Sequence, residues 1–118
     1  MDTTRQNKFA RLIQKELSEI FQRDGVAFYG NALVTITVVR AVPDLSVVKI
    51  YLSFLGVKDV QQRLEQIQSH TKEIRKKLGD KIKHQVRHIP ELIFYLDDSL
   101  EYADNIERLL KSIHPDTK

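Results

Sequence analysis

Two pairs of polar residues have the spacing that metal binding or acid–base chemistry uses. His84 and His88 are four positions apart, as zinc ligands on a helix can be, but Pro90 follows closely and there is no HExxH motif. Asp97 and Asp98 are adjacent carboxylates that could hold a metal or exchange a proton. Because this pair lies where a strand gives way to a helix, helix capping is the favoured interpretation. We therefore expect no metal site at either pair.

Other motifs for catalysis and phosphate binding are also missing. The sequence has no cysteine, which excludes disulfides, thiolate metal sites and a thiol nucleophile. Gly25 and Gly30 have the spacing of a P-loop, but Asn31-Ala32 replaces the required Lys-Ser/Thr, and there is no GxxG loop. No serine has the context of a nucleophile elbow: Ser46, Ser53, Ser69, Ser99 and Ser112. We predict that the protein is not an enzyme and carries no cofactor.

The strongest chemical signal is positive charge collected in two parts of the chain. The net charge is only +3, but Lys and Arg gather on one face of the first predicted helix and again over 72–88. Clustered cations release counterions from a phosphate backbone and so bind nucleic acid without reading its sequence. One such run alone is more often a solvated helix face, whereas two in a small domain favour binding. The candidate RNA-binding residues are Arg5, Lys8, Arg11, Lys15, Lys72, Arg75, Lys76, Lys77, Lys81, Lys83 and Arg87.

Length and composition indicate what kind of domain must carry these residues. The 118 residues are expected to form a single domain over 1–118, and 42% hydrophobic with 30% charged residues is typical of a water-soluble protein. No apolar run approaches the roughly 20 residues of a membrane span. The start of the chain, MDTTRQNKFARL, has no apolar signal-peptide region. We expect a cytoplasmic protein and, for want of a large apolar stripe, a monomer.

The periodicity of apolar residues predicts the element order α-β-β-α-(α)-β-α. An amphipathic helix from Thr4 to about Arg23 is expected to begin at a cap on Thr3 or Thr4 and to break at Asp24-Gly25, where a loop to residue 31 begins. Two strands, Ala32 to Val42 and Ser46 to Leu55, should form an antiparallel hairpin. Alternation places these apolar residues on one face: Val34, Ile36 and Val38 in the first strand, and Val48, Ile50, Leu52 and Phe54 in the second.

A helical stripe then runs from Val60 to Ile82, which is long for a small domain. We expect a bend within His70 to Gly79, with Gly79 favoured because glycine bends at the lowest cost. Pro90 precedes a third strand from Leu92 to Leu96. A last helix, capped within Asp97-Asp98-Ser99, carries an apolar set: Leu100, Ala103, Ile106, Leu109, Leu110 and Ile113.

Several strings follow one another in order across nearly the whole chain. They include VTITVV at 34–39, KIYLSFLG at 49–56, and Ile74-Arg75-Lys76 with Leu78-Gly79. The most specific is RHIPELIFYLDDS at 87–99, in which PEL precedes a Phe-containing strand and an Asp precedes the final helix. In this order the strings resemble the bacterial ribosome-binding factor A family. The sequence departs from the family at His70-Thr71-Lys72, where relatives have an Ala-x-Gly kink between the two central helices.

The resemblance implies an α+β, KH-like type II domain without a GxxG loop, in which helices cover one face of a three-stranded sheet. It also implies a non-enzymatic assembly factor that binds free small (30S) ribosomal subunits and assists late maturation and 5′-end processing of the 16S rRNA, with a link to growth at low temperature. Two alternatives stay open from the sequence: a general KH-like RNA- or DNA-binding module without ribosome preference, and a protein-interaction domain.

Overall fold

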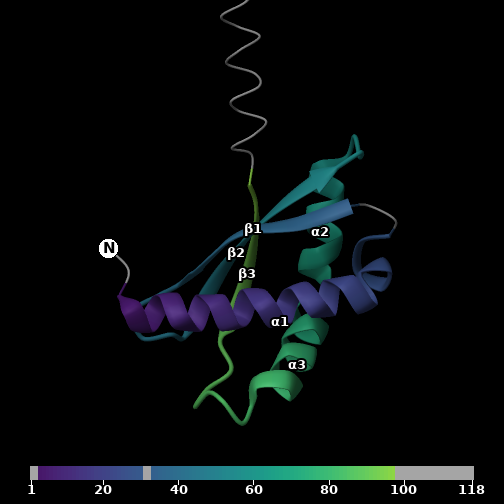
Figure 1. Cartoon of the computed structure of the whole chain (residues 1–118). Coiled ribbons are helices and arrows are strands. Elements are labelled where there is room, and N and C mark those ends of the chain that lie inside the picture. Colours follow the sequence, from purple (N-terminus) through teal and green to yellow (C-terminus); the bar gives the residue numbers. More distant parts are fainter. Residues whose placement is uncertain (1–2, 31–32, 98–118) are drawn as a thin grey trace, which may run out of the picture.

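The computed structural model describes residues 3–30 and 33–97, which form three helices and three strands (Figure 1). The elements are α1 (Thr4–Tyr29), β1 (Leu33–Ala41), β2 (Val47–Leu55), α2 (Val60–Ser69), α3 (Thr71–Ile82) and β3 (Glu91–Leu96). The predicted order is confirmed as far as β3. The predicted last helix, with its cap at Asp98 and Ser99, lies outside the described residues.

The strands form one mixed sheet in the order β1-β2-β3. The pair β1–β2 is the predicted antiparallel hairpin, and β3 runs parallel to β2, so the chain crosses over through α2 and α3 between them. The helices lie on one face of this sheet (Figure 1). The predicted inward set of β2 is confirmed, since four alternate residues are buried beneath the helices: Val48, Ile50, Leu52 and Phe54.

A β-bulge at Thr37 corrects the predicted facing of β1. The register shifts between Ile36, which pairs with Leu52, and Val38, which pairs with Tyr51. An extra residue in one strand moves the following side chains to the other face. Val38 is therefore exposed, contrary to prediction, and Val39 packs against the core in its place.

Helix α1 begins as predicted and ends later than predicted. The Thr3 hydroxyl accepts from the Gln6 N–H at 3.1 Å, while the Gln6 side chain accepts from the Thr3 N–H at 2.9 Å, which is a capping box. The predicted break at Gly25 is wrong, because α1 continues to Tyr29 and ends at Gly30, whose φ is 73°. A glycine inside a helix costs about 1 kcal/mol. Burial of Phe28 and Tyr29 offsets that cost, at roughly 1.5–3 kcal/mol for each large side chain.

The long central helix breaks at His70, between α2 and α3, and not at the favoured Gly79. Local hydrogen bonds explain the position, because the Ser69 hydroxyl donates to the Gln66 carbonyl at 2.6 Å and the Thr71 hydroxyl to the Gln68 carbonyl at 2.7 Å. Gly79 is ordinary helix interior in α3. The break thus lies at the first residue of the predicted interval, in the segment that the sequence aligns with the family's kink.

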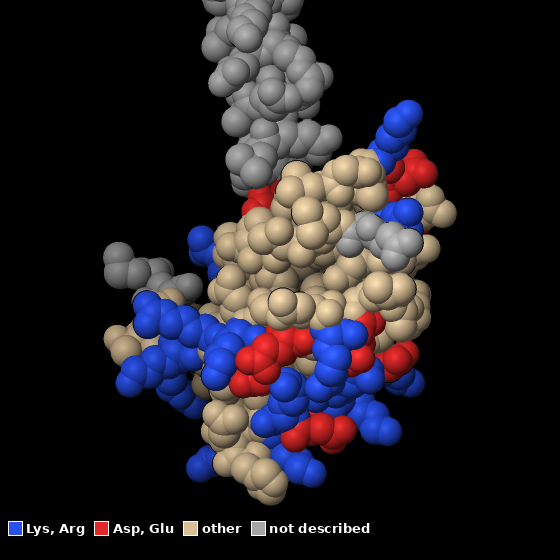
Figure 2. Space-filling view, turned by 45° about the vertical axis from the view of Figure 1, so that its right-hand side comes forward, with Lys and Arg blue, Asp and Glu red and all other residues tan. Residues whose placement is uncertain are grey.

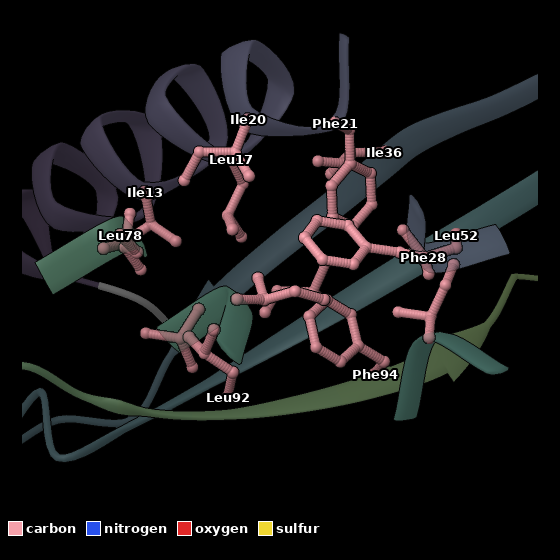
Figure 3. Close-up of a cluster of buried hydrophobic side chains, with 14 of the residues drawn as sticks. Ile13, Leu17, Ile20, Phe21, Phe28, Ile36, Leu52, Leu78, Leu92 and Phe94 are labelled. Carbon is pink, nitrogen blue, oxygen red and sulfur yellow. The ribbon is translucent and has the colours of Figure 1, made fainter. Parts of the chain in front are cut away.

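The core lies between the sheet and the helices (Figure 3). Phe21 of α1 is its centre: its ring stacks on Phe94 of β3 at 6.2 Å between centroids and approaches Phe28 at 6.5 Å. Toward the start of α1, the core includes Ile13 of α1 and Leu78 of α3, both fully buried. Packing of α1 on α3 is what brings the two predicted basic segments to one side of the molecule.

Candidate nucleic-acid interface

The four predicted cations of α1 are all exposed. Lys8, Arg11 and Lys15 lie opposite the buried stripe of that helix and Arg5 lies at its side. None of the four has an acidic partner within ion-pair distance among the residues described. The 3.6-residue repeat of the helix explains this placement, since apolar and basic residues occupy different sides. These four side chains are therefore available to phosphates.

The predicted cations of α3 divide into free and occupied groups. Lys72 and Lys76 are exposed, as is Lys83 just after the helix. By contrast, Lys77 lies 3.5 Å from the Asp24 carboxylate of α1, and Lys81 lies 3.4 Å from Glu16 and 3.1 Å from Glu19. The last two lysines link α3 to α1, so they position the basic helices and contribute less to any ligand contact.

These ion pairs affect the titration of their members. The hydrogen bond from Lys81 to Glu19 raises the pKa of the Lys81 ammonium, and Glu16 adds to the effect. The neighbouring Arg23 side chain lowers the pKa of the Asp24 carboxyl, and Lys77 lowers it further. Lys81 and Asp24 are thus held in their charged forms at neutral pH.

The two predicted arginines around the link from α3 to β3 have different surroundings. Arg75 donates from Nε to the Pro90 carbonyl oxygen and from Nη2 to the Ile89 carbonyl oxygen, each at 2.8 Å. Arg87 is exposed and lines a hollow together with Arg5 of α1. The first arginine holds the chain before β3 in place, while the second extends the positive charge of α1.

Figure 2 shows the combined result: most Lys and Arg on this face gather over α1 and α3, with Asp and Glu among them, and the part above is largely uncharged. We call eight of the predicted cations the basic surface: those whose side chains are exposed and make no ion pair or hydrogen bond to the backbone among the described residues. It consists of Arg5, Lys8, Arg11, Lys15, Lys72, Lys76, Lys83 and Arg87.

The residues considered for metal binding do not assemble a site in the part of the chain that the structure describes. His84 and His88 are both exposed, and no group of three or more His, Cys, Asp or Glu gathers there as a metal ligand set. The Asp97 carboxylate instead accepts a hydrogen bond from the Thr37 hydroxyl of β1. Over residues 3–30 and 33–97, no helix combines the length and apolar character that crossing a membrane requires.

Sequence reasoning missed two cations on the other side of the sheet. Arg40 of β1 and Lys49 of β2 are direct partners in the antiparallel register, on the face that α1, α2 and α3 leave uncovered. Alternation along each strand is the signal that could have found Lys49, because Val48 and Ile50 beside it are buried.

The element order α-β-β-α-α-β, with the helices on one face of a three-stranded mixed sheet, agrees with the KH-like fold that the resemblance implies. The family model described as Ribosome-binding factor A matches residues 5–110. The chain belongs to the ribosome-binding factor A family.

Individual relatives agree with this assignment. Ribosome-binding factor A of Cytophaga hutchinsonii is 50% identical over 113 residues, which cover 96% of this chain and 85% of that protein. The crystal structure of ribosome-binding factor A from Thermus thermophilus superposes with a TM-score of 0.65 at 19% identity, over 77% of this chain and 94% of that one. A Thermus thermophilus ribosome binding factor A fitted into the cryo-EM map of a 30S complex gives a TM-score of 0.61 at 19% identity, over 77% and 93%. These two structures share the fold described above.

Proposed function

We propose that this protein is a cytoplasmic assembly factor that binds the free small ribosomal subunit and assists late maturation of its rRNA, including 5′-end processing. It acts by binding and not by catalysis. Family membership and the 30S complex of the Thermus thermophilus relative support the partner. The single observation that carries the mode of binding is the basic surface, whose cations on α1 and α3 lack described acidic partners.

Within the proposed site, the eight cations of the basic surface contact rRNA phosphates. Lys77 and Lys81 bind the carboxylates of α1, and Arg75 binds backbone carbonyls, so these three act mainly by holding the surface in shape. Contacts from the remaining cations would be sequence-independent, because they address the phosphate backbone and not base edges. Recognition of the small subunit then depends on the shape of its rRNA.

Cosedimentation with free small subunits tests the proposal. Lys8→Glu on α1 and Lys76→Glu on α3 should each weaken binding, and each lost phosphate contact should reduce the slope of log affinity against log salt by about 0.7–0.9. Lys58→Glu is the matched control, since Lys58 is exposed but lies between β2 and α2, away from the basic surface.

The outcomes distinguish the proposal from the alternatives. Binding to free small subunits and not to intact ribosomes supports an assembly factor, whereas equal binding to unrelated RNA or DNA would indicate a general nucleic-acid module. Binding that is independent of salt, and equally strong in Lys8→Glu, Lys76→Glu and Lys58→Glu, would indicate a protein interface and overturn the proposed site.

A further inference from the structure

The face of the sheet opposite the helices carries exposed hydrophobic side chains and is uncovered by any described element. Of the six large hydrophobic residues exposed in the described part, five lie on this face, and the sixth is Val26 of α1. They are Leu33 and Val38 of β1, Leu55 of β2, and Ile93 and Tyr95 of β3. Tyr51 of β2 stacks on Tyr95 at 5.2 Å between ring centroids. We call this surface the open face; exposed large hydrophobic side chains gathered on one face of a sheet mark an interaction site.

The sequence of β3 is that of a strand covered on both sides. Its residues read Leu92-Ile93-Phe94-Tyr95-Leu96, without the alternation of polar and apolar residues that a half-exposed strand has. Leu92 and Phe94 face the helices, so Ile93 and Tyr95 are the residues that lack a cover.

The two positive charges on the open face indicate that the group covering it carries negative charge. Arg40 and Lys49 are directly opposite each other in the antiparallel pair, an arrangement that destabilises a sheet when the charges are alike. No acidic residue of the described ranges lies within ion-pair distance of either cation. An acidic partner on this face would relieve the repulsion.

The last described residue is anchored over the same face. The Asp97 N–H donates to the Leu52 carbonyl at 2.7 Å, which extends the β2–β3 ladder by one residue. Its carboxylate accepts from the Thr37 hydroxyl of β1, across the intervening strand β2. The chain that follows therefore starts at the edge of the open face.

We propose that the C-terminal segment, residues 98–118, docks on the open face as an amphipathic helix and supplies the missing layer. On a helical repeat of 100° per residue, one side is apolar: Ala103, Ile106, Leu109, Leu110 and Ile113. The opposite side is polar: Glu101, Asp104, Arg108 and Lys111. The segment contains five acidic and three basic residues, so its net charge is opposite to that of Arg40 and Lys49.

The length of a helix formed by the C-terminal segment matches the length of β3. A helix over 100–113 is about 20 Å long, and the six residues of β3 span about 20 Å. A helix that turns back after Ser99, with Leu100 at the level of Leu96, and runs antiparallel to β3 descends about 10 Å to the level of Ile93 in about seven residues, which is where Ile106 and Glu107 fall. Glu107 flanks the apolar side at that level, near the row formed by Arg40 and Lys49.

A tethered segment is favoured over a second molecule. Its covalent link to β3 gives it a high effective concentration at the open face, of millimolar order for a short connection. A second copy would add more Arg40 and Lys49 to the interface and leave their repulsion unrelieved. A nucleic acid strand would find two cations and the rings of Tyr51 and Tyr95, but these rings already stack on each other, and the exposed side chains beside them, Val38 and Ile93, are aliphatic.

Alkylation of a single cysteine tests the proposal, since the chain has no cysteine of its own. Ile93→Cys is introduced into the full chain, and its rate of reaction with N-ethylmaleimide is measured at low protein concentration. Ile106→Asp with Leu109→Asp should raise this rate at least about tenfold by releasing the segment, as expected when docking is populated above about 90%. The matched control, Arg108→Asp with Lys111→Asp, alters the polar side and should leave the rate within about twofold.

A second experiment tests which side of the C-terminal segment faces Ile93. Under mild oxidation, Ile93→Cys with Ile106→Cys should give an intramolecular disulfide, whereas Ile93→Cys with Arg108→Cys should not. Equal alkylation rates in all three chains together with no intramolecular disulfide would overturn the proposal. Protection that increases with protein concentration would assign the open face to a second copy, and protection that requires added rRNA would assign it to nucleic acid; either result also overturns it.

Discussion

Arg75 of α3 donates a 2.8 Å hydrogen bond from Nε to the carbonyl oxygen of Pro90, immediately before β3 begins. A second bond of the same length joins Nη2 to Ile89. The planar guanidinium holds two successive carbonyls at once, a geometry that the ammonium of a lysine does not reproduce. Arg75, which the charge pattern alone assigns to RNA binding, therefore also links α3 to the segment that precedes β3.

Replacing Arg75 should lower stability. Arg75→Gln removes two charge-assisted hydrogen bonds and should reduce the free energy of unfolding by about 1–2 kcal/mol. Urea denaturation followed by circular dichroism measures the change. Lys76→Gln, one residue further along α3 and exposed, should stay within about 0.5 kcal/mol of the parent. A neutral effect of Arg75→Gln would mean that these bonds contribute nothing to the fold.

Lys8 and Lys81 should give opposite results when each is changed to Gln. Lys81 is paired with Glu16 and Glu19, and its pKa is raised by the Glu19 hydrogen bond, so Lys81→Gln should lower the melting temperature. Lys8 is exposed without a described partner, so Lys8→Gln should leave melting unchanged and weaken binding to the small subunit. Melting curves and cosedimentation of the two variants, measured side by side, provide the check.

Gly79→Ala should stabilise the protein by about 0.5–1 kcal/mol, because Gly79 is helix interior. A Cβ there would meet its nearest neighbour, Ile89 Cγ1, at 3.4 Å, an ordinary van der Waals contact. Gly25→Ala is the contrasting variant: its Cβ would overlap the Tyr29 ring, whose hydroxyl donates to the Phe21 carbonyl, so a loss of about 1–3 kcal/mol is expected. Thermal melts that show Gly79→Ala to be clearly destabilising would contradict the helical assignment.

Acid should weaken the β1–β2 turn through Asp44. The Ser46 hydroxyl and backbone N–H donate to Asp44 Oδ1 at 2.6 and 3.0 Å, and they hold the pKa of this carboxyl below its usual range. A lowered pKa in the folded state means that the stabilisation is present above the unfolded pKa and is lost as the pH falls through the folded one. Unfolding free energies measured from about pH 5 to pH 2 should therefore decline.

Two substitutions separate the charge of Asp44 from its geometry. Asp44→Asn keeps an acceptor oxygen for Ser46 but cannot titrate, so it should show a shallower acid decline than the parent. Asp44→Ala removes the acceptor as well and should be less stable at neutral pH. An acid decline that is the same in the parent and in Asp44→Asn would show that other carboxyls determine it.

Local pattern was sufficient for the element order as far as β3, for a cap at the start of α1 and for the inward face of β2, because each depends on neighbours in sequence. Local pattern gave wrong predictions where contacts between residues far apart in sequence determine the structure. The burial of Phe28 and Tyr29 extends α1 past Gly25. The extra residue at Thr37 moves the Val38 side chain from the core face of the sheet to the exposed face. Neither outcome has a strong local signal.

The same distinction applies to the candidate site. The repeat of α1 was enough to predict that Lys8, Arg11 and Lys15 are exposed. The sequence could not predict the hydrogen bond between Lys81 and Glu19. The two residues are 62 positions apart and come into contact only when α3 packs on α1.

The parallel pairing of β2 with β3 has a consequence for how the chain folds. The β1–β2 hairpin closes through a short turn, whereas Val47 and Glu91 are partners far apart in sequence, with α2 and α3 between them. The loop-closure entropy of such a distant pairing must be overcome before its contacts form, so the hairpin and α1 can assemble early while β3 joins late. During synthesis, the edge of β2 that β3 covers therefore stays unpaired until the chain has been made through Leu96.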